Sequence, residues 1–148
     1  MPASLFNEHR EIILAAEQLL ATLQTTPPAP LDEISQLRAH IGSLTLSHLR
    51  NEEALIIGPL LTSRRIEELP DGHAIMVEIR ALRSTYSNHI RVWTPQAISN
   101  DRAGYTKAVT EITRLMKLNF EREEQYLHLP AIKLLHPAAL AKAERAAR

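Results

Sequence analysis

Four stripes of hydrophobic residues, in which apolar side chains recur every three or four positions, constrain the fold of this chain more than any other feature. This spacing places the side chains of one stripe on one face of an α-helix. No segment shows the alternation of apolar and polar residues that is typical of a strand. We therefore predict an all-α fold. The stripes comprise Leu5, His9, Ile12, Ala16, Leu19 and Leu23; Ile34, Leu37, Ile41, Leu44, His48, Glu52 and Leu55; Met76, Ile79, Leu82, Tyr86, Ile90 and Trp93; and Tyr105, Val109, Ile112, Met116, Asn119, Glu123 and Tyr126.

Segments rich in proline or glycine separate the stripes. QTTPPAP at 24–30 ends the first helix, because consecutive prolines cannot lie in a helix interior. We expect Gly58 and Pro59 to end the second helix. The third helix should follow LPDG at 69–72 and stop at Pro95.

The remaining boundaries predict the topology. SND at 99–101 is a capping signal for the fourth helix, which Pro130 should end or kink. Four helices of roughly 20 to 28 residues with short connections are typical of an up-down-up-down four-helix bundle. We assign the bundle to residues 1–132. The Ala-rich segment 133–148, with its alternating charges, predicts a short C-terminal helical tail.

Composition narrows the classes of function. Seventeen basic residues balance seventeen acidic ones, so the chain has no excess of positive charge that would favour binding to nucleic acid or an anionic membrane. The sequence contains no cysteine, which excludes disulfides, thiolate nucleophiles and Cys-based metal sites. No apolar run approaches the length of a membrane span, and the N-terminus lacks a signal-peptide pattern. We therefore expect a cytoplasmic protein that binds neither nucleic acid nor a membrane.

Polar side chains occupy positions of the second and fourth stripes that should face the core. His48 and Glu52 are four residues apart, as are Asn119 and Glu123, so each pair shares one helix face. A buried carboxylate must be paired with a positive charge or bind a metal ion. We expect no basic residue beside either carboxylate, so a centre of iron, manganese or zinc would satisfy their charges. The nearby arginines flank the stripes: Arg10, Arg50, Arg80 and Arg122.

The two polar pairs belong to a repeated phrase. HLRNEEALIIGPLL, which begins at His48, aligns without a gap with NFEREEQYLHLPAI, which begins at Asn119. The alignment matches two glutamates and one proline of each copy, but the second copy begins with asparagine where the first begins with histidine. The matched pairs are Glu52 with Glu123, Glu53 with Glu124 and Pro59 with Pro130.

Chain direction brings the polar residues to one level. If successive helices alternate in direction, the starts of the odd helices and the ends of the even helices meet at the same end of the bundle. Two further histidines lie near the starts of the first and third helices. The residues expected at this common end are His9, His48, Glu52, His73, Asn119 and Glu123.

These residues resemble the hemerythrin-like (His-His-Glu cation-binding) family over nearly the whole chain, from residue 3 to about residue 132. The resemblance implies a four-helix bundle that holds non-haem iron, with carboxylates bridging two irons and histidines capping them. Asn119 stands where the family has its fourth-helix histidine, and Val77 where some members have a further histidine. By position, the implied metal ligands are His9, His48, Glu52, His73 and Glu123.

The loss of histidine at position 119 implies an altered centre, because an amide is a poor ligand for a transition metal. We interpret Asn119 as a weak ligand or the holder of a water molecule. The alternatives are a more open di-iron centre, a single-metal site and a lapsed site without metal. Open coordination positions would bind O2, nitric oxide or peroxide.

The expected function is therefore sensing of O2, nitric oxide or redox state, or iron handling. The sequence shows no catalytic base, nucleophile or substrate pocket, so we assign no enzymatic activity to it. One alternative is a metal-free helical bundle that binds a protein partner. Another is a di-iron oxidase or peroxidase. A homodimer is compatible with each of these functions. Glu53 and Glu124 are interpreted as solvated carboxylates or as hydrogen-bond partners of ligand histidines. Four other histidines are interpreted as structural or solvated: His40, His89, His128 and His136.

Overall fold

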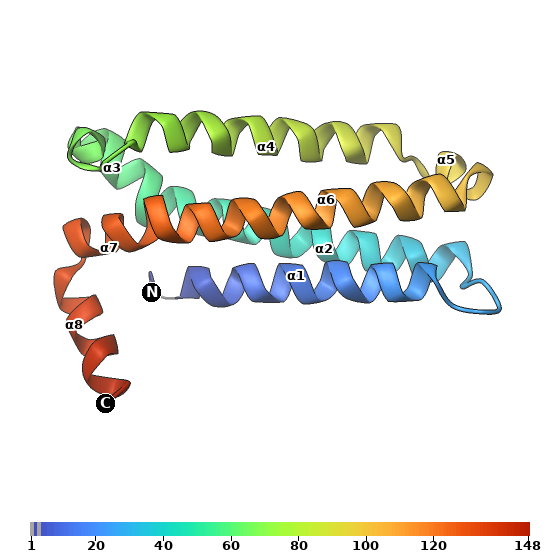
Figure 1. Cartoon of the computed structure of the whole chain (residues 1–148), viewed down its shortest axis with the longest axis horizontal. Helices are drawn as coiled ribbons and strands as arrows, with labels where there is room; N and C mark the ends of the chain where they lie inside the picture. Colours follow the sequence, from blue (N-terminus) through green and yellow to red (C-terminus); the bar gives the residue numbers. More distant parts are fainter. Residues whose placement is uncertain (1, 3) are drawn as a thin grey trace.

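The computed structural model describes residue 2 and residues 4–148, and every secondary-structure element in these parts of the chain is helical. The all-α prediction is confirmed. In Figure 1 the four longest helices lie along the long axis of the molecule, and the colours show that successive ones run in opposite directions. These helices are α1 (Ser4–Leu23), α2 (Leu31–Glu52), α4 (Gly72–Val92) and α6 (Arg102–Glu123).

The second and fourth long helices continue beyond the repeated phrase through π-helical turns. α2 passes through η1 (Glu53–Ile57) into α3 (Gly58–Thr62). α6 passes through η3 (Glu124–His128) into α7 (Leu129–Leu135). The two copies of the phrase therefore adopt the same local structure, in which a wide turn directly follows each carboxylate, Glu52 or Glu123.

The prolines of the phrase do not end these helices. Pro59 and Pro130 each lie in the first turn of the helix that follows the π turn, a position that tolerates a missing backbone N–H. The predicted end of the second helix at Gly58 and Pro59 is therefore wrong, because helical backbone continues to Thr62.

Short elements connect the long helices. A 3-10 turn, η2 (Arg65–Glu68), precedes α4, and α5 (Pro95–Asn100) lies between α4 and α6. The turn into α4 requires glycine, since a Cβ on Gly72 would lie 2.6 Å from the carbonyl oxygen of Ile66. The predicted cap of the fourth helix is confirmed, because the Asp101 side chain accepts a hydrogen bond from the Gly104 N–H at 2.9 Å.

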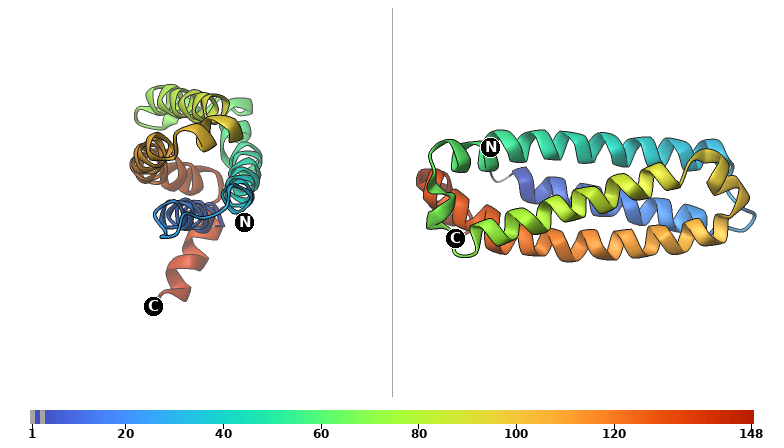
Figure 2. Two further views of the ribbon diagram at one scale, coloured as in Figure 1. Left: turned by 90° about the vertical axis from the view of Figure 1, so that its right-hand side faces the viewer. Right: turned by 90° about the horizontal axis from the view of Figure 1, so that it is seen from above.

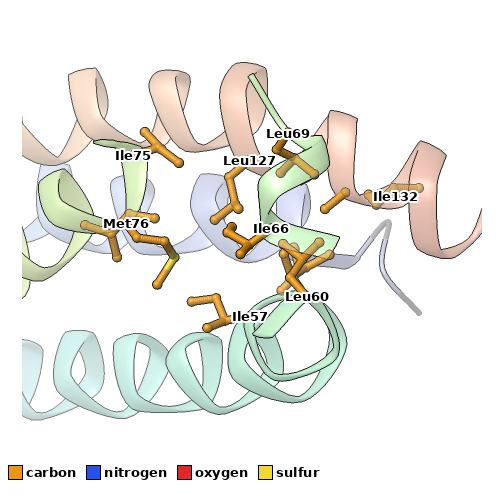
Figure 3. Packing of buried hydrophobic residues seen from close by; sticks show 12 residues of the cluster. Ile57, Leu60, Ile66, Leu69, Ile75, Met76, Leu127 and Ile132 are labelled. Atoms are coloured by element: carbon orange, nitrogen blue, oxygen red, sulfur yellow. The ribbon is translucent and has the colours of Figure 1, made fainter. Parts of the chain in front are cut away.

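Two hydrophobic clusters follow each other along the molecule. The end core gathers the first turns of α1 and α4 and the π turns with the helices that follow them; Figure 3 shows its packing. The shaft core gathers the middle and far parts of the long helices. End-core members include Leu5, Ile56, Ile79 and Leu127, and shaft-core members include Ile12, Ile41, Val109 and Met116.

The C-terminal helix α8 (Pro137–Ala146) follows a break at His136 and packs on α7. Figure 2 shows it projecting away from the long helices. The predicted helical tail is thus present, although α7 extends past the predicted boundary at residue 132. No helix in the described parts of the chain is long and apolar enough to cross a membrane.

Candidate metal centre

Four buried side chains from three helices meet between the end core and the shaft core. His9 comes from α1, His48 and Glu52 from the end of α2, and Glu123 from the end of α6. One potential ligand atom from each residue lies within 4.8 Å of those of the other three. None of the four residues is more than 4% exposed. We call this group the His/Glu cluster; it brings together four of the six residues predicted from the sequence.

The two imidazoles of the cluster face each other through their Nε2 atoms, which are 3.1 Å apart. Their outer nitrogens contact carboxylates: His48 Nδ1 lies 2.8 Å from Glu8 Oε2, and His9 Nδ1 lies 3.3 Å from Glu124 Oε1. Each outer nitrogen therefore donates its N–H outward, which leaves both inner nitrogens as lone pairs. Two lone pairs repel at this distance, so either a proton or a metal ion has to lie between them.

The two carboxylates of the cluster each present one oxygen to the imidazoles. Glu52 Oε2 lies 3.4 Å from His48 Nε2, and Glu123 Oε2 lies 3.2 Å from His9 Nε2. Glu123 Oε2 is buried and accepts no hydrogen bond from the described residues. Its other oxygen, Oε1, accepts a 2.7 Å hydrogen bond from the Asn119 amide. The structure thus places Asn119, which is itself buried, behind the carboxylate that it orients.

An arginine from α4 neutralises Glu52, contrary to the expectation that no basic residue would approach the carboxylates. Arg83 donates from a terminal guanidinium nitrogen to Glu52 Oε1 at 2.9 Å. Its side chain is 36% exposed, whereas that of Glu52 is 1% exposed. The long side chain reaches the cluster from the edge of the helix face, so the alignment of Cα positions along the stripe gives no sign of the contact.

A fifth residue, His128, belongs to the site although the sequence analysis interpreted it as structural or solvated. It is fully buried, and its Nε2 lies 2.9 Å from Glu52 Oε2. Its ring lies 5.1 Å from that of His9, centroid to centroid. Its other nitrogen, Nδ1, is buried without a hydrogen-bond partner among the described residues.

The π turn explains why helical periodicity missed this histidine. In an α-helix, residue 128 would point about 140° away from Glu123, five positions earlier. A π turn bonds residues five apart, so it brings His128 back toward the face that carries Glu123. In the aligned repeat His128 corresponds to Ile57. The first copy therefore has its histidine, His48, before Glu52, whereas the second copy has its histidine, His128, after Glu123.

The structure does not bring His73 to the cluster. This residue is exposed in the first turn of α4, and the equally exposed Val77 lies one turn further on. Because α2 and α6 continue through their π turns, the first turn of α4 lies beyond the level of the cluster and packs in the end core. The α4 residue at the level of the cluster is Arg83.

Burial and mutual charge shift the pKa values of the cluster. Burial, together with His48, lowers the pKa of His9 to about 3. Burial acts to lower the pKa of His48 as well, but hydrogen bonding to Glu52 holds it above its usual value. Burial, with the charge of Glu52, raises the pKa of Glu123 to about 8. Burial acts to raise the pKa of Glu52, yet two histidines hold it well below its usual range. Because the pKa of His48 is raised and that of His9 is lowered, a proton between the imidazoles favours His48, and the raised pKa of Glu123 favours its protonated form in the absence of metal.

Openings on two sides lead to the cluster. The Phe120 ring stacks on His9, with centroids 3.9 Å apart and planes within 5° of parallel. Beside it, an open cavity of about 390 Å³ is lined by His9, Phe120 and Glu124. A second cavity, of about 250 Å³, is lined by His48, Arg83 and Glu123 together with apolar residues of α2 and α4.

The sequence matches no protein-family model, and neither the comparison with curated proteins nor that with solved structures finds a similar protein. The resemblance drawn from the spacing of the polar residues therefore stays a prediction.

Proposed function

We propose that this protein binds one divalent transition-metal ion in the His/Glu cluster. The observation that carries the proposal is the 3.1 Å approach of the two Nε2 atoms while Glu8 and Glu124 hold the outer nitrogens. A histidine whose outer N–H is bonded to a carboxylate is the usual arrangement of a metal ligand, because the bond fixes the ring and raises its basicity. His9, His48, Glu52 and Glu123 would bind the ion.

The carboxylate contacts favour a single ion over a bridged pair. A carboxylate that bridges two metal ions uses both of its oxygens. Here Arg83 bonds one oxygen of Glu52, and Asn119 bonds one oxygen of Glu123. Each carboxylate therefore has one remaining oxygen that faces the cluster, although that of Glu52 also contacts His128. Of the three alternatives that the sequence left open, the single-metal site fits these contacts best.

Iron is the proposed ion. Two imidazoles and two carboxylates suit iron, manganese and zinc. The resemblance of the chain to the hemerythrin-like family, whose members hold iron in an up-down-up-down bundle, favours iron among these metals. Such an iron, with a coordination position toward the open cavity beside Phe120, would serve in sensing O2, nitric oxide or redox state, or in iron handling. His128 would lie beside the ion as a hydrogen-bonding group or a further ligand.

A second candidate is a metal-free helical bundle that binds a protein partner. Arg83 and His128 both contact Glu52, so they satisfy this buried carboxylate without any ion. In this form a proton on His48 Nε2 would always lie between the two imidazoles, and no metal ion would replace it. The two candidates differ in whether purified protein takes up metal.

Metal content after reconstitution separates these candidates. The wild-type protein, His48→Ala and His40→Ala would each be reconstituted anaerobically with Fe(II), desalted and analysed for iron. His40 is exposed on the same helix as His48 and supplies the matched control. We expect about one iron per chain in the wild type and in His40→Ala, and less than about a tenth of that in His48→Ala.

Two results would revise the proposal. Two irons per wild-type chain would replace the single-metal site with a di-iron centre. Failure of the folded wild-type protein to retain Fe(II), Mn(II) or Zn(II) would leave the metal-free module. If iron is retained, a change in its absorbance on titration with nitric oxide would support the sensing function, and an unchanged spectrum would count against it.

A further inference from the structure

A long apolar cavity lies in the middle of the molecule, on the shaft-core side of the His/Glu cluster. One part, of about 430 Å³, lies among α1, α2, α4 and α6. The second part is the 250 Å³ cavity that reaches His48 and Arg83. The two parts share four of their lining residues, so they lie side by side, and together we call them the Gly42 cavity. Its size is that of a small-molecule site. The shared residues are Gly42, Tyr86, Ile90 and Met116.

Gly42 keeps this space open. It lies in the interior of α2, where glycine lowers helix stability by about 1 kcal/mol relative to alanine. Glycine usually occurs in a helix because another chain segment approaches closely, as at Gly72. A Cβ on Gly42, however, would meet no atom of the described residues within 4 Å. Helix packing therefore does not explain the glycine, whereas a cavity that must admit a ligand does.

A guanidinium group lies at the end of the cavity remote from the His/Glu cluster. Arg38 lines the larger part and is half-buried. It donates a hydrogen bond to the Trp93 carbonyl, and its guanidinium carbon lies 5.7 Å from the Tyr105 ring centroid. No carboxylate forms an ion pair with it among the residues that the structure describes. A guanidinium has five N–H donors, so Arg38 retains donors for an anion.

A second polar group, the Thr113 hydroxyl, also lines the cavity. Thr113 is 4% exposed, lines the larger part, and its buried hydroxyl has no hydrogen-bond partner within the described chain. Most of the remaining lining is aliphatic, from Ala16, Leu19 and Ile41 to Ile112 and Met116. An apolar ligand with a single polar head matches a cavity of this kind.

The length of the cavity restricts the ligand further. Arg38 and His48 are ten residues apart on α2, which corresponds to about 15 Å along the helix axis. We propose that the Gly42 cavity binds a linear aliphatic carboxylate. Its carboxylate accepts hydrogen bonds from Arg38, and its chain runs past Gly42 toward Met116 and Phe120. The planar carboxylate fits the guanidinium fork, which a hydroxyl head group cannot match.

This proposal does not depend on metal, because neither Arg38 nor Gly42 belongs to the His/Glu cluster. The metal-free protein is therefore titrated with dodecanoate by calorimetry, with the fluorescence of Trp93, the only tryptophan, as a second readout. We expect saturable binding at one site per chain. Dodecan-1-ol, which has the same chain without the charge, should bind at least about tenfold more weakly. Equal affinity for the two would overturn the role of Arg38.

Two variants and their controls locate the ligand. Gly42→Leu places a side chain into the cavity and should weaken dodecanoate binding by at least about tenfold without lowering the melting temperature. Ser43→Leu adds the same side chain at the neighbouring exposed position and should bind as the wild type does. Binding that is unchanged in Gly42→Leu would overturn the proposal.

Arg38→Gln tests the head group. It should weaken dodecanoate binding about tenfold and leave dodecan-1-ol binding unchanged. Arg102→Gln is the control, because Arg102 also donates to a backbone carbonyl, that of Ala29, but does not line the cavity. The absence of saturable binding of octanoate, dodecanoate and hexadecanoate by the folded wild type would likewise overturn the proposal.

Discussion

Glu52 is the residue at which metal binding and metal-free folding compete. Its two oxygens contact Arg83, His48 and His128, so positive or hydrogen-bonding groups surround a carboxylate that is 1% exposed. An ion in the cluster would have to share Glu52 with the guanidinium. The like charges of Arg83 and of the ion would repel each other.

Replacement of Arg83 should therefore have opposite effects on the metal-free fold and on metal binding. In Arg83→Gln, Glu52 loses a charge-assisted hydrogen bond, so the metal-free protein should be less stable to urea by about 1–2 kcal/mol. Its metal affinity should rise about tenfold, because one positive charge near the ion is removed. Arg80→Gln, at an exposed position of the same helix, is the control. Lower metal affinity in Arg83→Gln would mean that Arg83 positions Glu52 for the ion.

Glu123 should make the stability of the metal-free protein depend on pH. Its pKa is raised from 4.5 to about 8 in the folded state, so the fold keeps a proton that the unfolded chain loses. This difference lowers stability progressively as pH rises from about 4.5 to about 8. Glutamine mimics the protonated form. Glu123→Gln should therefore match the wild type near pH 5 and exceed it by a few kcal/mol near pH 8 in urea unfolding.

The control for this measurement is Glu121→Gln, at an exposed position of the same helix. Its stability difference from the wild type should be the same at both pH values. A Glu123→Gln difference that does not grow with pH would show that Glu123 is ionised in the metal-free fold.

At the scale of elements, the regular spacing of apolar residues predicted the long helices, but it did not predict the π turns that interrupt this spacing. The four long helices follow from their stripes, and His9, His48, Glu52 and Glu123 meet because each lies on a buried face. The π turns break the 3.6-residue period directly after each carboxylate. They move the start of α4 beyond the site and turn one further histidine inward.

The same cause explains why the sequence analysis missed the contacts of His128 and Arg83 with Glu52 and expected His73 at the cluster. His128 enters the site because the π turn brings it to the face of Glu123, which α-helical counting cannot reveal. Arg83 and His73 depend on the level of α4 relative to the other helices, and that level is set by the extra turns after Glu52. The repeated phrase was the sequence signal for these turns, because both copies carry a proline at the same distance after the carboxylate.

Two of the helical glycines, Gly42 and Gly72, predict opposite responses to the same substitution. Gly42→Ala should stabilise the protein by about 1 kcal/mol, because alanine favours helix and its Cβ meets no neighbour. Gly72→Ala should destabilise it by more than about 1 kcal/mol, since its Cβ would lie 2.6 Å from a backbone oxygen. Urea or thermal unfolding of both variants checks the signs. Destabilisation by Gly42→Ala would show that α2 packs more closely there than the structure indicates.

At the scale of the whole molecule, the cluster joins three helices between two separate hydrophobic cores. An ion bound there would cross-link α1, α2 and α6 in the folded state only. A saturating metal ion, at about one hundred times its dissociation constant, should therefore stabilise the protein by about 2.7 kcal/mol. The melting temperature of wild-type protein should rise with added metal, and that of His48→Ala should not.

Proton release on metal binding tests the central claim, that the gap between His9 and His48 holds either a proton or a metal ion. Metal binding is measured by calorimetry at pH 7 in buffers of different ionisation enthalpy. We predict release of about two protons per ion, one from His48 and one from Glu123, and an affinity that rises with pH up to about 8. Binding without proton release, with an affinity independent of pH, would contradict the claim.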